Sequence, residues 1–423
     1  MTERLAVLLD GAVIGHLSRS AAREEPEFTY APAYVRDGEV ALSGRLPLRL
    51  DTYPAKSVMP YLAGLLPESL EAREAWATQM EGVDADDAFS MLAVMGRDCP
   101  GAVQFCAEDA VAELAERAGE LHALGDVQIA DRIRSLAGGD PSWTMPGEHW
   151  SLGGQQEKFA LAWTDAGWCA VHGSAATTHI IKPGITRLMH QALVEHVTMA
   201  AARRVGVAVA GSTLGRFDDQ WAIVVERFDR AVVDSEIVRI HQEDFAQACG
   251  RMPERKYESR GGPMLRDMMA VVSRESTSAF DDKLALADFL IINLVAGAPD
   301  GHAKNISLLR APGFVGVAPL YDLATGLTYE AATIDRSVAL SIGGERQVSR
   351  IRRAQWEKAA DVLGLPADLL LGRVEGLAGS FADAFADVLE SLPEDVPGLV
   401  EVAERTIPAL RQHAEVVLGG LSS

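Results

Sequence analysis

The fold is best worked out from one stretch, Phe289-Leu-Ile-Ile-Asn-Leu-Val-Ala-Gly-Ala-Pro-Asp-Gly-His-Ala-Lys-Asn305. Its first part, Phe289 to Ala298, is the longest apolar run of the chain and predicts a buried helix or strand. The run leads into Asp300-Gly301, and Asn305 follows the aspartate by five residues. Alone, this pattern is a turn. It also pairs a carboxylate, which can accept or orient a hydroxyl proton, with an amide oxygen, which can bind a metal ion without adding charge.

A second acid strengthens the chemical interpretation. Asp322 lies in the apolar stretch Val317-Ala-Pro-Leu-Tyr-Asp-Leu, 17 residues after Asn305. Protein kinases have the same Asp-to-Asn spacing in their catalytic loop, and a later Asp binds the magnesium that bridges the ATP phosphates. A carboxylate in an apolar stretch is costly to bury without a partner, although an exposed turn aspartate is the alternative. The order of the three residues favours a magnesium site at Asn305 and Asp322.

Upstream lies a glycine-containing segment, Ser151-Leu-Gly-Gly-Gln-Gln-Glu-Lys158. Gly153 and Gly154 allow backbone amides to approach phosphate oxygens. The segment matches neither the Walker A motif nor the glycine loop of ordinary kinases. A flexible turn that leads into a strand therefore remains the alternative.

Three further positions are candidates for nucleotide contacts. Lys182 ends the predicted strand His179 to Lys182, where kinases place a lysine that pairs with phosphates; a surface lysine is the alternative. Glu226 to Phe228 fits the segment whose backbone would contact adenine; a strand end with a surface charge run is the alternative. His302 could act as an acid or base, but we rank it below Asp300 because such a histidine more often braces the loop.

Two further acidic motifs have structural interpretations. Glu157 could pair with Lys158 or with Lys182. His241-Gln-Glu-Asp244 is expected to start a helix, because acidic residues stabilise a helix N-terminus.

The elements follow from periodicity and turn signals. Two apolar runs flank Asp10-Gly11 and predict a hairpin. Helices are expected at about 60–81, over 107–137 and at 189–204, and most of the chain from about 234 onward also has helical spacing. Strands are expected at 158–163, 168–171, 179–182 and 221–228. We place a domain boundary in Ala137-Gly-Gly-Asp-Pro-Ser-Trp143.

Composition limits the possible functions. The chain has 423 residues, of which 48% are hydrophobic, and its net charge of -21 repels phosphodiester backbones. Direct non-specific binding to nucleic acid is therefore not expected. One basic patch is a candidate exception, but a solvated helix face is the simpler interpretation; it comprises Arg346, Arg350, Arg352 and Arg353.

Cysteine usage and hydropathy indicate the compartment. The four cysteines are scattered, none forms a Cys-x-x-Cys pair, and a reducing cytoplasm is expected. The apolar stretch near the N-terminus is broken at Asp10-Gly11, too early for a signal peptide. No run is long enough to span a membrane. We predict a cytoplasmic protein without a membrane segment.

Taken in order, the motifs resemble those of the HipA-like kinases of bacterial toxin–antitoxin systems. The resemblance covers most of the chain. It is carried by Leu9-Asp-Gly, Leu65-Leu-Pro-Glu, Met95-Gly-Arg-Asp-Cys-Pro-Gly-Ala-Val-Gln, Ser151-Leu-Gly-Gly-Gln-Gln-Glu-Lys-Phe, Thr178-His-Ile-Ile-Lys-Pro, Val225-Glu-Arg-Phe-Asp-Arg, His241-Gln-Glu-Asp, Asp300-Gly-His-Ala-Lys-Asn and Leu320-Tyr-Asp-Leu. One departure is Trp150 immediately before Ser151, where a less bulky residue is expected.

The resemblance implies an α+β, two-lobed protein-kinase-like fold with a strand-rich N-terminal region and a mostly helical C-terminal lobe. The expected domains are an N-terminal subdomain at 1–105, a helical connection at 106–145, the kinase N-lobe at 146–230 and the helical C-lobe at 231–423.

The resemblance also assigns roles to residues. It makes Asp300 the catalytic base, Asn305 and Asp322 the magnesium ligands, and Lys182 a contact to the ATP phosphates. Glu226 and Phe228 would hold adenine through their backbone, and Ser151 would be a site of self-phosphorylation. Lys182 is also expected to be catalytic, and the remaining expected ATP contacts are Ser151, Gly153, Gly154, Lys158 and His302.

The functional hypothesis is an ATP- and Mg2+-dependent serine/threonine protein kinase that acts as a toxin. Its expected partners are a HipB-like helix-turn-helix antitoxin, through which DNA contact is only indirect, and a protein target; family targets include aminoacyl-tRNA synthetases. Two alternatives stay open: a small-molecule kinase of the same fold, and a non-catalytic co-repressor that binds an antitoxin.

Overall fold

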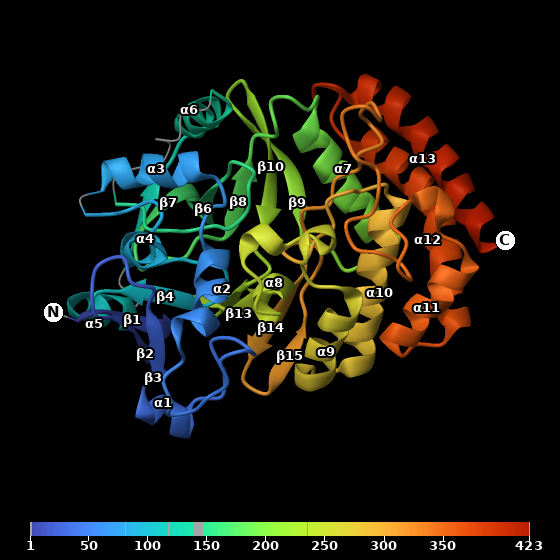
Figure 1. Cartoon of the computed structure of the whole chain (residues 1–423). Helices are drawn as coiled ribbons and strands as arrows, with labels where there is room; N and C mark the ends of the chain where they lie inside the picture. Colours follow the sequence, from blue (N-terminus) through green and yellow to red (C-terminus); the bar gives the residue numbers. More distant parts are fainter. Residues whose placement is uncertain (1, 81, 117–118, 139–146, 235, 423) are drawn as a thin grey trace. The chain divides into compact units, whose positions relative to one another are not determined.

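A computed structural model describes residues 2–80, 82–116, 119–138, 147–234 and 236–422. The chain forms two compact units. The first comprises Met1–Pro183, Gly215–Pro253 and Leu308–Val315; the second comprises Gly184–Leu214, Glu254–Ser307 and Gly316–Ser423. Figure 1 shows the elements of both, coloured along the sequence.

The first sheet is a four-stranded antiparallel sheet in the first unit, with the order β3-β2-β1-β4. Its strands are β1 (Glu3–Leu9), β2 (Ala12–Arg19), β3 (Glu27–Tyr30) and β4 (Val103–Cys106). The hairpin predicted at Asp10-Gly11 is confirmed, because Leu9 pairs with Ala12. Asp10 and Gly11 both have positive φ, at 46° and 84°, as a type I′ turn requires.

Four helices follow this hairpin along the chain: α1 (Pro32–Asp37), α2 (Ala55–Leu65), α3 (Leu70–Gln79) and α4 (Ala88–Met95). The single helix expected at about 60–81 is wrong in one respect, because the chain leaves the helix between α2 and α3. Pro67 cannot continue a helical ladder. Ser69 then starts α3 by accepting a hydrogen bond from the Ala72 amide. Residue 81 lies outside the described residues.

The second sheet has six strands in the order β5-β7-β6-β8-β10-β9. The strands expected at 158–163, 168–171, 179–182 and 221–228 are confirmed as β6, β7, β8 and β10. The bounds are β5 (Gly119–Ala123), β6 (Phe159–Thr164), β7 (Gly167–Gly173), β8 (His179–Lys182), β9 (Ser212–Phe217) and β10 (Gln220–Glu226).

The continuous helix expected over 107–137 is wrong. The segment contains η1 (Glu108–Ala110), α5 (Val111–Ala115), strand β5 and α6 (Asp126–Ala137). Pairing of β5 with β7 across Leu121 and Val171 overrides the helical composition, because long-range pairing is not encoded in local propensity. The boundary predicted at 137–143 extends into residues 139–146, which lie outside the described residues.

The chain after about residue 234 is less uniformly helical than expected. It contains β12 (Glu236–Arg239), β13 (His241–Asp244), β14 (Ser307–Ala311) and β15 (Phe314–Val317), while β11 (Arg230–Val233) pairs with β12. The helix expected to start in His241–Asp244 begins only at Phe245, as α8 (Phe245–Ala248). Asp244 is its N-cap and accepts a hydrogen bond from the Gln247 amide at 2.8 Å.

The second unit is mainly helical. The helix expected at 189–204 is confirmed as α7, and it begins at Gln191 after His190, whose φ is 52°. The apolar run Phe289–Val295 is the end of α10, which packs with α7 and α13 around α12. The helices are α7 (Gln191–Arg204), η3 (Glu258–Arg260), α9 (Leu265–Glu275), α10 (Ala279–Val295), η4 (Val348–Arg350), α11 (Arg353–Leu363), α12 (Ala367–Ser391) and α13 (Leu399–Leu421), with η2 (Pro253–Arg255) at its edge.

Apolar spacing explains the packing of α12. Its buried residues recur every three or four positions, so that they form one face along the helix; they include Leu370, Val374, Leu377, Phe381 and Phe385. Within the part of the chain that the structure describes, no helix is both long enough and apolar enough to cross a membrane.

Candidate active site

The catalytic-loop candidate leaves the C-terminal end of α10, and the sequence explains its shape. A Cβ atom at Gly301 would lie 2.5 Å from the side chain of Asn293, so only glycine fits after Asp300. Asn293 is the polar residue within the apolar run, and its amide donates to the Phe289 carbonyl at 2.8 Å. The Asp-Gly pair therefore reflects close packing against α10.

The structure brings Asp300 and Asn305 together. The Asn305 side-chain amide donates to the Asp300 carbonyl oxygen at 2.7 Å, and the Asn305 backbone amide donates to the His302 carbonyl at 2.9 Å. Since Nδ2 is engaged, the carboxamide of Asn305 presents Oδ1 as its acceptor. Asn305 is buried, whereas the Asp300 side chain is 60% exposed. The loop thus fixes an amide oxygen beside an accessible carboxylate.

Asp322 lies on a segment that is tied to the same loop. The Tyr321 hydroxyl donates to the Lys304 carbonyl at 2.7 Å and also contacts the Ser307 hydroxyl at 2.7 Å. Leu320 forms a bridge with Val209, but Asp322 itself lies outside any strand. Its φ of 57° is left-handed, a conformation that aspartate tolerates better than most residues.

His302 is a bracing residue in this structure. Burial, followed by the neighbouring Lys256, lowers the pKa of its imidazole to about 3, although Asp322 acts in the opposite direction. The ring is therefore neutral near pH 7, and its Nδ1 accepts a hydrogen bond from the Lys304 amide at 3.3 Å. A neutral imidazole cannot supply a proton as imidazolium does, which supports the lower rank given to His302 as an acid.

The glycine-containing segment lies in the first unit and is fastened at several points. Gly154 has a φ of 105° and forms a bridge with Pro67, and its carbonyl accepts from the Glu68 amide at 3.0 Å. Lys158 donates from Nζ to the Gly153 carbonyl at 2.9 Å. The Leu65-Leu-Pro-Glu68 motif thus holds this segment in place.

Ser151 is fully buried. Its hydroxyl donates to the Leu65 carbonyl at 2.8 Å, and its amide donates to the Asp98 carbonyl at 3.0 Å. Trp150, the departure noted in the sequence, lies edge-on against Trp76 of α3 with ring centroids 5.8 Å apart. The two indoles anchor the start of the segment, so the bulky residue is accommodated by a partner ring.

The remaining nucleotide candidates also belong to the first unit. Lys182 is buried at the end of β8, where it pairs with Ile223. Glu226 is exposed at the end of β10, and Phe228 follows in irregular backbone. Arg227 lies between them, and its backbone amide donates to the Thr178 carbonyl at 2.9 Å.

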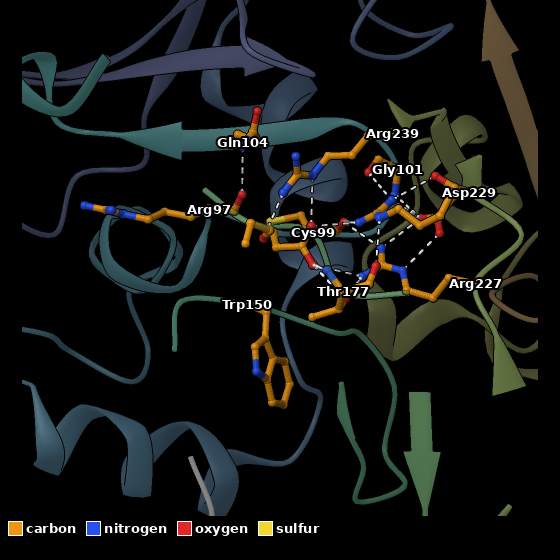
Figure 2. A network of polar contacts seen from close by, with 12 residues as sticks. Arg97, Cys99, Gly101, Gln104, Trp150, Thr177, Arg227, Asp229 and Arg239 are labelled. Carbon is orange, nitrogen blue, oxygen red and sulfur yellow. Dashed lines mark hydrogen bonds and ion pairs between the residues drawn. The ribbon is translucent and has the colours of Figure 1, made fainter. Parts of the chain in front are cut away.

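A buried network of charges surrounds Arg227, as Figure 2 shows. The guanidinium of Arg227 donates to both oxygens of Asp229, to Thr177 and to the Cys99 carbonyl, and its Nη1 lies 3.2 Å from Asp98. Burial raises the pKa of the Asp98 carboxyl, but Arg230, Arg239 and Arg227 outweigh burial and hold that pKa below its ordinary value. The network joins the segment after α4 to the end of β10.

Sequence reasoning missed Lys256, Tyr257 and Lys304. Tyr257 donates a hydrogen bond to Oδ1 of Asp300 across 43 residues of sequence. Lys304 could have been suspected because it directly precedes Asn305. Nothing local marks Lys256 and Tyr257, since their role depends on a contact that only the fold creates.

A magnesium ion bound with ATP fits this donor set. Among the described residues no three or more histidine, cysteine, aspartate or glutamate side chains gather as a metal site. Magnesium is usually held by one or two carboxylates together with substrate phosphates rather than by an all-protein cage. Asp322 and the Asn305 amide oxygen meet that requirement on two separate segments.

The strand-rich first unit, the helical second unit and the Asp-x4-Asn loop define an α+β protein of the kinase-like class. Comparisons with known proteins then identify the family. Residues 5–106 match the HipA N-terminal domain, and residues 150–385 match the HipA-like C-terminal domain. The chain belongs to the HipA family, which confirms the resemblance and the fold expected from the sequence.

Individual relatives agree over nearly full length. Y4mE of Sinorhizobium fredii, which is named as a kinase on a provisional basis, is 34% identical to this chain. The aligned region covers 92% of this chain and 93% of Y4mE. The serine/threonine-protein kinase toxin HipA of Shewanella oneidensis is 29% identical over 93% and 90% of the two chains. A solved complex of HipA, HipB and operator DNA from that organism superposes with a TM-score of 0.84 at 25% identity, covering 98% and 97%.

Proposed function

We propose that the protein is an ATP- and magnesium-dependent serine/threonine protein kinase and the toxin of a toxin–antitoxin pair. The observation that carries the proposal is the joint placement of Asp300, Asn305 and Asp322 on two tied segments of one unit. Kinship with a kinase toxin supports it. The arrangement supplies an accessible carboxylate for the acceptor hydroxyl beside two oxygen ligands for a metal ion.

In this proposal, Asp300 accepts the proton of a serine or threonine hydroxyl as that oxygen attacks the γ-phosphorus of ATP. The bond between the γ-phosphorus and the bridging oxygen breaks, and ADP leaves. Asn305 and Asp322 hold magnesium, which when bound neutralises charge on the phosphates. His302 stays neutral and supports the loop.

Residues of the first unit would bind the rest of the nucleotide. Lys182 and Lys158 are cations suited to phosphate oxygens, and amides near Gly153 and Gly154 can donate to them. The backbone of Glu226 and Phe228 would bind adenine. The division into 1–105, 106–145, 146–230 and 231–423 is retained as the proposed domain organisation.

We further propose that the chain phosphorylates itself on Ser151. Because Ser151 is buried against Leu65, its hydroxyl can receive phosphate only after the segment detaches. The hydrogen bonds from Ser151 to Leu65 and Asp98, and from the Glu68 amide to the Gly154 carbonyl, must then break.

The proposed partner is a HipB-like helix-turn-helix antitoxin, because the superposed relative was solved with HipB and operator DNA. DNA contact would be indirect, since a net charge of -21 disfavours phosphates. The proposed location of this chain is the cytoplasm, and its proposed target is a protein, with an aminoacyl-tRNA synthetase as the candidate class.

Phosphoproteomics after controlled expression tests the proposal, with the Asp300→Asn variant as the matched control. Phosphoserine or phosphothreonine on a defined protein, seen with wild type and absent with the variant, is the expected result. A labelled small molecule without any labelled protein would identify a small-molecule kinase instead. ATP binding without consumption under all conditions would leave a non-catalytic co-repressor.

A further inference from the structure

The side chain of Tyr257 lies against the carboxylate that the proposed reaction uses. Its phenol donates a hydrogen bond to Oδ1 of Asp300. His302 approaches the same oxygen with its Nε2 at 3.9 Å. Oδ1 of the proposed base therefore accepts a hydrogen bond from Tyr257, although the Asp300 side chain is 60% exposed to solvent.

The ring of Tyr257 is held firmly. It meets the buried His302 ring edge-on, with centroids 4.8 Å apart and an interplanar angle of 89°. Two cations flank it, with Lys256 Nζ at 5.6 Å and Arg260 Cζ at 5.5 Å from the ring centroid. Aromatic and cation–π contacts of this kind restrain a ring that an exposed hydrogen bond alone would not fix.

The backbone around Tyr257 is hydrogen-bonded to the proposed catalytic loop and is itself held in a tight turn. The Ala303 amide donates to the Lys256 carbonyl at 3.3 Å, and the amides of Arg260 and Gly262 donate to the Tyr257 carbonyl, both at 2.9 Å. A Cβ at Gly262 would lie 2.7 Å from that carbonyl oxygen, so the turn requires glycine there.

A second anchor lies one residue further. Both carboxylate oxygens of Glu258 accept hydrogen bonds, from the Ser341 amide at 2.6 Å and from the Ser341 hydroxyl at 2.7 Å. Tyr257 is therefore fixed on both sides of its own position. This firmness argues against a side chain that swings away to admit substrate.

We propose that Tyr257 is a positioning residue for the phosphoryl-transfer reaction: its phenol donates to Oδ1 of Asp300 and fixes the orientation in which the carboxylate accepts the proton of the acceptor hydroxyl. The inference rests on the proposed function, since it presumes that Asp300 is the base. A neutral donor suits this task because it orients the carboxylate without cancelling the charge that attracts the hydroxyl proton. The His302 ring, which meets the phenol ring edge-on, supports it in this orientation.

The test compares Tyr257→Phe with wild type. Phenylalanine keeps the ring against His302 and removes only the hydroxyl. Two reactions are followed with ATP and magnesium: phosphate release with water as acceptor, and incorporation of labelled phosphate into the chain itself. Hydrogen bonds to charged groups are worth enough to predict a kcat lower by about 10- to 100-fold.

Readouts other than activity separate positioning from a structural role. ATP–magnesium affinity measured by calorimetry, and hydrogen exchange of the amides at 300–305, should match wild type. If the variant instead binds ATP more weakly and exchanges faster at the loop, Tyr257 only supports the fold and the inference is wrong. An unchanged or increased kcat also overturns the inference, because the phenol would then either play no part in phosphoryl transfer or hinder it.

Controls make the two proposals separable. Tyr34→Phe removes a phenol that donates to the Val40 carbonyl at 2.9 Å in the other unit, and it should leave both reactions unchanged. Asp300→Asn should abolish them. If wild type itself shows neither reaction, the proposed function fails. If wild type is active, Asp300→Asn is inactive and Tyr257→Phe equals wild type, only the inference on Tyr257 fails.

Discussion

The hydroxyl of Ser151 donates to the carbonyl oxygen of Leu65 at 2.8 Å, in a place closed to solvent. A carbonyl oxygen can only accept, and a phosphate on Ser151 would offer it further acceptor oxygens with -1.5 to about -2 charges at neutral pH. The present position is therefore incompatible with phosphoserine.

From this relationship we predict that phosphorylation on Ser151 locks the glycine-containing segment away from Leu65 and weakens ATP binding by more than about tenfold. Mass spectrometry maps the sites after reaction with ATP, and calorimetry then titrates nucleotide into each separated form. Ser151→Ala serves as the control that cannot be modified and should bind ATP as unmodified protein does. Equal affinity of the two forms, or no phosphate on Ser151, would contradict the prediction.

Asp300→Asn should keep the fold and ATP binding but lose phosphoryl transfer. The amide has nearly the same shape, yet it can neither take a proton nor carry the charge. We expect a normal thermal shift on addition of ATP and magnesium with no phosphorylated product. Full activity of the variant would move the base to another residue, with His302 the first to examine.

Asp322→Asn should lower the rate by roughly 10²- to 10³-fold, the usual cost of one preorganised electrostatic group. ATP affinity should fall less, because the first unit would still bind the nucleotide. Turnover is to be measured over a magnesium titration, in which the variant should require more metal. Near-normal turnover at low magnesium would refute the role of Asp322 as a ligand.

Asp98→Asn should destabilise the protein by about 3–5 kcal/mol, the cost of breaking a buried ion pair, because Arg227, Arg230 and Arg239 lose their shared partner. The arginines hold the folded-state pKa of Asp98 below its ordinary 3.8. Its contribution is therefore present above about pH 4 and is lost as the pH falls further, since the unfolded chain takes up the proton first.

Chemical unfolding at several pH values measures this contribution. The gap in unfolding free energy between wild type and Asp98→Asn should be full near pH 7 and should narrow below about pH 4. Asp387→Asn removes the exposed partner of Arg204 and should change the unfolding free energy by less than about 1 kcal/mol at each of these pH values. A gap that is independent of pH would contradict the assignment.

Local signals account for what the sequence predicted well. Asp10-Gly11 sets its own turn, and the pairing of Leu9 with Ala12 confirms that prediction. The Asp300–Asn305 spacing is likewise contained in six residues, which the structure brings together, while their catalytic roles stay a prediction. Strand β5 was missed because its five residues are all exposed and show no buried face, and they form a strand only by pairing with β7. Tyr257 was missed for the same physical reason: 43 residues separate it from Asp300, and no periodicity reports such a contact.

The edge-on pair of Trp150 and Trp76 has an optical consequence. Both indoles are 1% exposed, and such apolar surroundings give blue-shifted emission. In the detachment proposed above, Trp150 would enter water and its fluorescence would move to longer wavelength. Because the chain has seven tryptophans, subtraction of the Trp150→Phe signal isolates this one. The Trp150–Trp76 contact that holds the segment at Ser151 would therefore also report the release of that segment, in real time and without an added label.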